Sequence, residues 1–199
     1  MTLSARIIPI LVIIGIFYSG CMKENVPSEE VAVGWEEQAR VYERSSEWKE
    51  ATKAWEEAAE AWQKQAENLE KTGDIQQASE AMEKAAADWE AKAKAHEKAF
   101  EWKKAIRAYE KATEVWEMAA KSWEVIDCIQ RPKNCYTKVA NCWFVIGGIY
   151  NIWLMNDKKA VEAYEKAAEI YEANGYEILA ESCRRLASEA SKEIALKNP

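Results

Sequence analysis

Large aromatic residues recur along the chain at a fixed spacing. Each lies 27 residues after the one before it, and they are Trp35, Trp62, Trp89, Trp116 and Trp143. Tyr171 follows after a step of 28. A second column keeps the same spacing and contains Ala51, Ala78, Ala105, Pro132 and, after the one-residue insertion, Ala160. Self-similarity at a fixed period of roughly 20–50 residues is typical of repeat architectures. We therefore take the 27-residue unit as the basis of the fold.

Within a unit, the apolar positions follow a helical spacing. Around Trp116 they are Trp102, Ala105, Tyr109, Ala112, Trp116, Ala119 and Trp123. Steps of three and four residues keep one side of an α-helix turned toward its neighbours. Small positions let a neighbouring backbone approach, and the rings fill the adjoining space. We expect the periodic tryptophans to serve repeat packing rather than to form a ladder for stacking ligands.

Between units the spacing shortens to six residues, which indicates a turn. Thr72-Gly73-Asp74 contains a helix stop and an N-cap, with Gln77 placed for a capping box. The junction at 97–101 is weaker, and one continuous helix is the alternative there. Pro132 predicts a late start for the fifth helix. The sequence thus predicts an all-α antiparallel helical repeat array of about seven helices, at 28–45, 47–71, 74–98, 101–127, 133–155, 157–173 and 176–196.

The start of the chain differs from the repeats. Ile7 to Phe17 is an apolar run of eleven residues, and Arg6 is the only charged residue of the first twenty. This layout is typical of a secretory signal peptide and is too short to span a bilayer comfortably. The run ends in Tyr18-Ser19-Gly20-Cys21, which resembles the lipobox of prokaryotic lipoproteins, although tyrosine stands where leucine is usual.

That resemblance implies an acylated Cys21. It predicts a signal peptide at 1–20, a lipid-anchored tether at 21–30 and a helical repeat domain at 31–197. The expected location is a cell membrane, on its extracytoplasmic face. The alternative is an uncleaved hydrophobic anchor in which Cys21 has no role.

Charge excludes one class of partner. The chain of 199 residues has a formal net charge of −7, and its lysines alternate with glutamates instead of forming a block. Nucleic-acid binding needs an excess of Lys and Arg to neutralise phosphates. Alternating charges along a helix are usually a solvated surface. We expect no nucleic-acid partner.

The repeat resembles a known family of helical motifs. Trp35-x-x-Gln38-Ala39-x-x-Tyr42, and later Asn156-Asp157-Lys158-Lys159-Ala160-x-x-x-Tyr164-x-x-Ala167, are similar to the tetratricopeptide consensus. The period departs from that consensus, since it is 27 instead of about 34, with one helix per unit instead of two. In this it looks more like the soluble NSF attachment protein variant. The resemblance implies a curved helical array that binds proteins, but not vesicle-fusion activity, because a lipoprotein leader places the chain outside the cytoplasm.

Four cysteines follow Cys21, namely Cys128, Cys135, Cys142 and Cys183. In an exported domain they predict disulfides. Cys128 and Cys135 could meet across the turn at 129–134, and Cys142 with Cys183 would then join the last helix to the fifth. Zinc is not expected, since there is no CxxC motif and no nearby histidine. No other feature indicates a cofactor.

His96 is the only histidine, and it stands in the same repeat column as Tyr42, Leu69 and Trp123. A packing role therefore outweighs catalysis. Paired carboxylates are numerous but fall on expected solvent faces. We predict that the chain is not an enzyme.

One segment breaks the amphipathic pattern. Residues 143–155 are apolar almost all round, which predicts a central helix covered on both faces. A partner groove or a membrane-facing patch is the alternative, and Gly147-Gly148 would permit close approach of another helix. Together these features predict an extracytoplasmic lipoprotein that is a scaffold or adaptor for protein partners in an envelope complex. The alternative function is a carrier of a lipid or small hydrophobic ligand.

Overall fold

The computed structural model describes residues 28–126 and 128–197. The predicted signal peptide, Cys21 and most of the tether lie outside the described residues. Within them the chain forms seven α-helices and one π-helix, and no strand. The elements are α2 (Ser28–Arg44), α3 (Trp48–Thr72), α4 (Ile75–Lys98), α5 (Trp102–Val125), α6 (Gln130–Gly148), η1 (Ile149–Trp153), α7 (Asp157–Ala173) and α8 (Glu177–Lys197).

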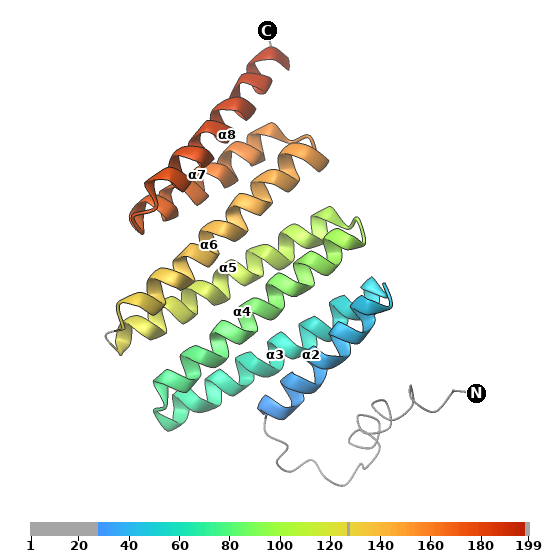
Figure 1. Ribbon diagram of the computed structural model, residues 1–199, viewed down its shortest axis with the longest axis vertical. Helices are drawn as coiled ribbons and strands as arrows, with labels where there is room; N and C mark the ends of the chain where they lie inside the picture. Colours follow the sequence, from blue (N-terminus) through green and yellow to red (C-terminus); the bar gives the residue numbers. More distant parts are fainter. Residues whose placement is uncertain (1–27, 127, 198–199) are drawn as a thin grey trace, which may run out of the picture.

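Successive helices run antiparallel side by side and build an elongated array (Figure 1). Each 27-residue unit contributes one helix, so the predicted all-α helical repeat fold is confirmed. The turns between α2 and α3, α4 and α5, and η1 and α7 share one edge of the array, which we call the Phe100 edge. The other three junctions lie along the opposite edge.

The junctions repeat one backbone geometry. A left-handed residue stands at the same place in five of them, at Ser46, Gly73, Phe100, Met155 and Gly175, with φ between 48° and 84°. At four of these turns the next amide donates to the carbonyl five residues earlier, and the pairs are Glu47 with Tyr42, Asp74 with Leu69, Glu101 with His96 and Tyr176 with Tyr171. This is the Schellman pattern that ends helices. The weak junction at 97–101 is therefore a turn and not a continuous helix.

The alanine column lets the helices pack closely. Ala51, Ala78, Ala105 and Ala160 are all fully buried. Aromatic rings fill the space between them, as Tyr109 and Trp116 do in α5. The amphipathic stripe inferred from the three-and-four spacing is the face that the array buries.

The fifth helix departs from its predicted bounds at both ends. It begins at Gln130 instead of 133, because Pro132 stands in the first turn, where a missing N–H leaves no hydrogen bond unmade. The regular helix stops at Gly148 and continues as the π-helix η1. In the part of the chain that the structure describes, no helix is long and apolar enough to cross a membrane.

Candidate interaction surface

The periodic tryptophans lie in the packed interior of the array. Trp62, Trp89 and Trp116 are buried, and Trp35 and Trp143 are half-buried. Each of the three buried indoles donates a hydrogen bond to the residue 26 positions earlier, which directly follows the preceding tryptophan of the ladder. The pairs are Trp62 with Glu36 at 2.8 Å, Trp89 with Gln63 at 3.3 Å and Trp116 with Glu90 at 2.7 Å. Successive helices are thus joined by the same polar contact.

A second ladder escaped the sequence reasoning. Three aromatic residues each donate to a glutamate twelve residues earlier, and the pairs are Trp55 with Glu43, Tyr109 with Glu97 and Tyr136 with Glu124. The acceptors belong to a column at Glu43, Glu70, Glu97 and Glu124, again 27 residues apart. This spacing was available in the sequence. Its meaning is not evident from the sequence alone, because glutamates on a helical repeat usually lie on the solvent face.

Glu83 of α4 links three helices. Its carboxylate accepts from the Trp123 indole at 2.7 Å and from the Arg131 guanidinium at 3.0 Å. The Cys135 thiol also points to it, with 3.7 Å between Sγ and Oε1. A carboxylate held by a cation and an indole N–H is a strong structural contact. We assign Glu83 to the fold rather than to a reaction.

The cysteines overturn one expectation. Cys128, Cys135, Cys142 and Cys183 are all free thiols in the structure, so the predicted Cys128–Cys135 and Cys142–Cys183 disulfides are not formed. Cys135 is turned toward Glu83, while Cys142 and Cys183 pack in different apolar clusters. Burial raises the pKa of Cys135 to about 12, and burial also raises the pKa of Cys142 and Cys183. Such thiols are poor nucleophiles.

His96 occupies the end of α4 and is buried. Its Nδ1 lies 2.7 Å from a Glu101 oxygen, and the other oxygen of that carboxylate binds Lys104 at 2.6 Å. Burial lowers the pKa of His96, and the Glu101 hydrogen bond opposes this shift. The pair closes the turn between α4 and α5. Beside it, a hollow of about 340 Å³ is lined by Trp89, Lys92, His96, Lys104, Arg107, Ala108 and Lys111.

Asp88 is a buried acid that no motif singled out. It lies on α4, 5% exposed, and its Oδ2 has no hydrogen-bond partner among the described residues. Burial, and then the nearby Glu36 carboxylate, raise its pKa to about 8, against a smaller opposing effect of Arg40. The acid is therefore largely protonated at neutral pH. Its neighbours Glu36 and Arg40 belong to α2, so this contact joins the first helix to the third.

The apolar segment at 143–155 is covered on one side only, which corrects the expected central helix. Ile146 and Ile149 are buried, but Ile152, Trp153 and Met155 are exposed. The inner side packs so closely on α7 that a Cβ atom at Gly147 would lie 2.7 Å from the Tyr164 ring. The glycine therefore serves approach by a helix of the same chain. The π-helix carries the outer residues to the Phe100 edge.

Those residues meet the turn between α4 and α5. Trp153 stacks on Trp102 with 4.3 Å between ring centroids, and Phe100 meets Trp102 edge-on at 5.9 Å. Phe100 and Met155 are exposed and hold the left-handed conformation with φ of 58° and 48°. We call these exposed side chains the apolar rim, made of Phe100, Ile152, Trp153 and Met155.

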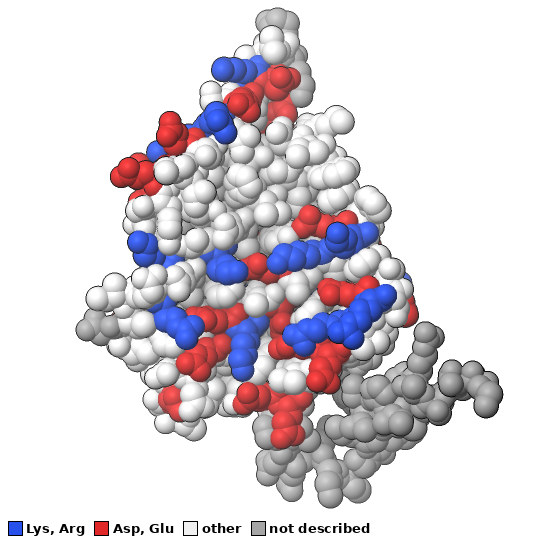
Figure 2. All heavy atoms as spheres, in the orientation of Figure 1, with Lys and Arg blue, Asp and Glu red and all other residues white. Residues whose placement is uncertain are grey.

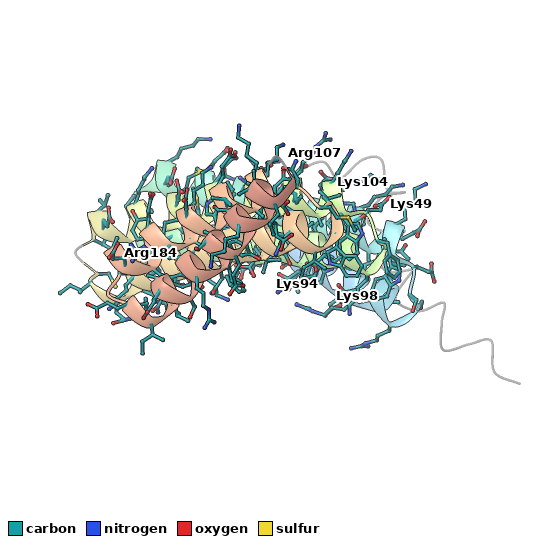
Figure 3. All side chains as sticks on the ribbon, turned by 90° about the horizontal axis from the view of Figure 1, so that it is seen from above. Lys49, Lys94, Lys98, Lys104, Arg107 and Arg184 are labelled. Atoms are coloured by element: carbon teal, nitrogen blue, oxygen red, sulfur yellow. The ribbon has the colours of Figure 1, made fainter. Side chains whose placement is uncertain are left out.

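A hollow of about 700 Å³ adjoins the rim. We call it the basic groove, and it is lined by Lys103, Ile106, Arg107, Glu110, Tyr150, Trp153, Leu154, Asn156 and Lys159. Three cations thus face one carboxylate. On the face shown in Figure 2, by contrast, acidic and basic side chains are interleaved, as the alternating sequence indicates. Figure 3 shows that Lys104 and Arg107 project from one face of the array, and Lys94 and Lys98 from the other.

Comparison with known proteins gives no family. No family model matches the sequence, and no curated protein matches it. Among solved structures, the chain is similar to the de novo designed helical repeat protein DHR64, with 19% identity over 84% of this chain and 80% of that one, at a TM-score of 0.43. It is also similar to MamA, with 16% identity over 85% and 97% of the two chains, at a TM-score of 0.27. A third similar structure is BtubC from P. vanneervenii, with 13% identity over 88% of this chain and 94% of that one, at a TM-score of 0.18.

Proposed function

We propose that this protein is a membrane-anchored adaptor that holds a protein partner at the extracytoplasmic face of a cell membrane. The apolar rim is the observation that carries the proposal. Its side chains are 73% exposed at Phe100, 64% at Ile152, 52% at Trp153 and 78% at Met155. Contiguous exposed apolar residues on a charged protein mark interaction sites. Extended helical arrays present surfaces suited to such binding.

The anchor rests on the leader. An apolar run of eleven residues followed by Ser19-Gly20-Cys21 supports lipid attachment at Cys21. A single acylated residue close to Ser28, the start of α2, would hold the array at the bilayer surface. Binding would then take place in the space next to the membrane.

The carrier function has less support. A carrier of a lipid or small hydrophobic ligand needs an enclosed pocket that is mostly apolar. The hollow beside residues 143–155 is instead lined by Lys103, Arg107 and Lys159 along with its apolar residues. Among the described residues, no group of His, Cys, Asp or Glu is suited to holding a metal. The prediction that the chain is not an enzyme stays a prediction.

Crosslinking in intact membranes tests the adaptor proposal. The full chain is expected to capture the same protein in repeated pull-downs and to remain in the membrane fraction. Cys21→Ala should move the chain to the soluble fraction and reduce that capture. A chain that stays monomeric and without a reproducible partner would contradict the adaptor function. Retention of Cys21→Ala in the membrane would contradict the lipid anchor alone.

A further inference from the structure

The basic groove contains more cations than carboxylates, because Lys103, Arg107 and Lys159 line it together with Glu110 alone. Other cations of the chain are neutralised by ion pairs, such as Lys92 with Glu56 at 2.6 Å and Arg131 with Glu83 at 3.0 Å. Among the described residues, no carboxylate lies within ion-pair distance of Lys103, Arg107 or Lys159. Unpaired cations around a hollow create a local positive potential that attracts anionic groups.

The backbone adds to this potential. The groove lies at the N-terminal end of α5, where unsatisfied N–H groups and the helix dipole favour negative charge. Helices usually place acids there, but the first turn of α5 contains none and carries Lys103 and Lys104 instead. The nearest acid, Glu101, does not cap the helix with its side chain, because its carboxylate binds Lys104 and His96.

The apolar rim joins the groove through Trp153, which belongs to both. Two residues of the rim, Phe100 and Met155, have a left-handed backbone, which is unfavourable for any residue other than glycine. Gly73 and Gly175 fill the equivalent position on the opposite edge without that strain. Phe100 and Met155 thus give up local stability and expose large apolar side chains next to a cationic hollow.

We infer that the basic groove and apolar rim together bind an acidic segment of a partner protein that also carries apolar side chains. Its carboxylates would lie against Lys103, Arg107 and Lys159, and its apolar side chains against Trp153 and Phe100. The inference rests on the proposed adaptor function and names the chemistry of the partner. Charge complementarity of this kind sets specificity and speeds association.

An anionic membrane offers the same two chemistries, but the shape of the site favours a protein. The basic groove is a hollow of about 700 Å³, which suits a chain segment better than a flat membrane surface.

Binding of a labelled synthetic peptide that alternates glutamate with phenylalanine and leucine tests the inference. The full chain in detergent should bind this peptide, and affinity should fall as salt rises. The double variant Lys103→Glu/Arg107→Glu should weaken binding by roughly tenfold or more. The matched control is Lys94→Glu/Lys98→Glu, which makes the same change of charge on the opposite face and should leave affinity unchanged.

A second variant separates binding from folding. Phe100→Gly removes a rim side chain and relieves the left-handed backbone, so it should weaken peptide binding several-fold while raising the melting temperature. Equal binding by all variants, or no binding by the unmodified chain, would overturn the inference. The unmodified chain could instead bind phosphatidylglycerol vesicles and not the peptide, and the groove variant could lose the vesicle binding. That result would contradict a protein segment as the ligand and would indicate a membrane surface.

The experiments distinguish a failure of the adaptor function from a failure of the groove as its binding site. A partner captured equally well by the groove variant would leave the adaptor function standing and remove the groove as its site. Peptide binding that depends on Lys103 and Arg107, without any partner captured from membranes, would support the groove and contradict the adaptor.

Discussion

At the scale of single residues, a buried acid, Asp88, lies at the contact between α4 and α2. Asp88 is buried against α2, next to Glu36, and burial raises its pKa to about 8. An acid whose pKa is higher in the folded state than in the unfolded state binds a proton more tightly when folded. Its contribution to stability is complete below the unfolded pKa of about 3.9 and is lost as pH rises through the folded pKa. The contact between α2 and α4 therefore weakens toward alkaline pH.

Asp88→Asn should remove this dependence, because the amide stays neutral at every pH. Between pH 5 and pH 8 the unfolding free energy of the unmodified chain should fall relative to the variant, by at most about 1.4 kcal/mol per pH unit. Urea unfolding of both proteins at several pH values measures the difference. If the difference in unfolding free energy between the two proteins stays constant across this range, Asp88 has an ordinary pKa in the folded state.

Buried thiols make a second prediction at this scale. In a Cys21→Ser background, denatured protein prepared without reductant should react with four equivalents of a thiol reagent, since all four remaining cysteines are free. Under native conditions Cys128, which is half-buried, should react first, and Cys135, Cys142 and Cys183 much more slowly. Recovery of fewer than four thiols would indicate disulfides after all.

Burial of the periodic columns could be predicted at this scale, but the burial of Asp88 and the surroundings of the cysteines could not. Trp62, Trp89 and Trp116 lie on a stripe that the three-and-four spacing defines by itself. Asp88 looks like any exposed acid in the sequence, because its burial depends on how α2 crosses α4. The cysteine pairs failed for a related reason. Spacing shows which residues share a helix face, and not toward which neighbour a thiol turns.

At the scale of elements, the close contact between α6 and α7 depends on a single missing methyl group. Gly147→Ala would place its Cβ 2.7 Å from the Tyr164 ring, which is rigid and 3% exposed. The variant should lower the unfolding free energy by about 1–3 kcal/mol through overpacking. Denaturant unfolding measures the change.

Gly148→Ala is the matched control, because its Cβ would meet only the Tyr164 hydroxyl, at 3.8 Å. It should be neutral or stabilising by up to about 1 kcal/mol, since alanine favours a helix more than glycine does. Equal destabilisation by both variants would mean that helix distortion, and not the ring, sets the effect.

The number of helices and most of their bounds could be predicted, because each unit repeats the same stripe and the same six-residue junction. The fifth helix was harder. A proline can stand in the first turn of a helix as well as before it, so Pro132 did not fix the start. The change to a π-helix after Gly148 has no signal in the apolar run. It decides which side chains reach the rim, so the exposed site at Trp153 could not be derived from the sequence.

At the scale of the whole molecule, each helix depends on its neighbours, and burial is uneven along the array. Eleven residues are buried in each of α4 and α5, but only two in α2. Repeat arrays gain stability from interfaces between neighbours and open from their ends. Amide hydrogen exchange followed by mass spectrometry should thus be slowest in α4 and α5 and fast in α2. Uniform protection along the chain would indicate a single cooperative unit instead.

The alternating direction of the helices also bears on how such a chain can grow. Duplication of one 27-residue unit would reverse every helix after it and move later turns to the opposite edge. Only duplication of a pair, 54 residues, leaves the two edges as they were. The residues at the left-handed position alternate between the edges, with Ser46, Phe100 and Met155 on one edge and Gly73 and Gly175 on the other. The repeat that determines packing is therefore one helix, whereas the repeat that can be duplicated without changing a binding edge is a pair of helices.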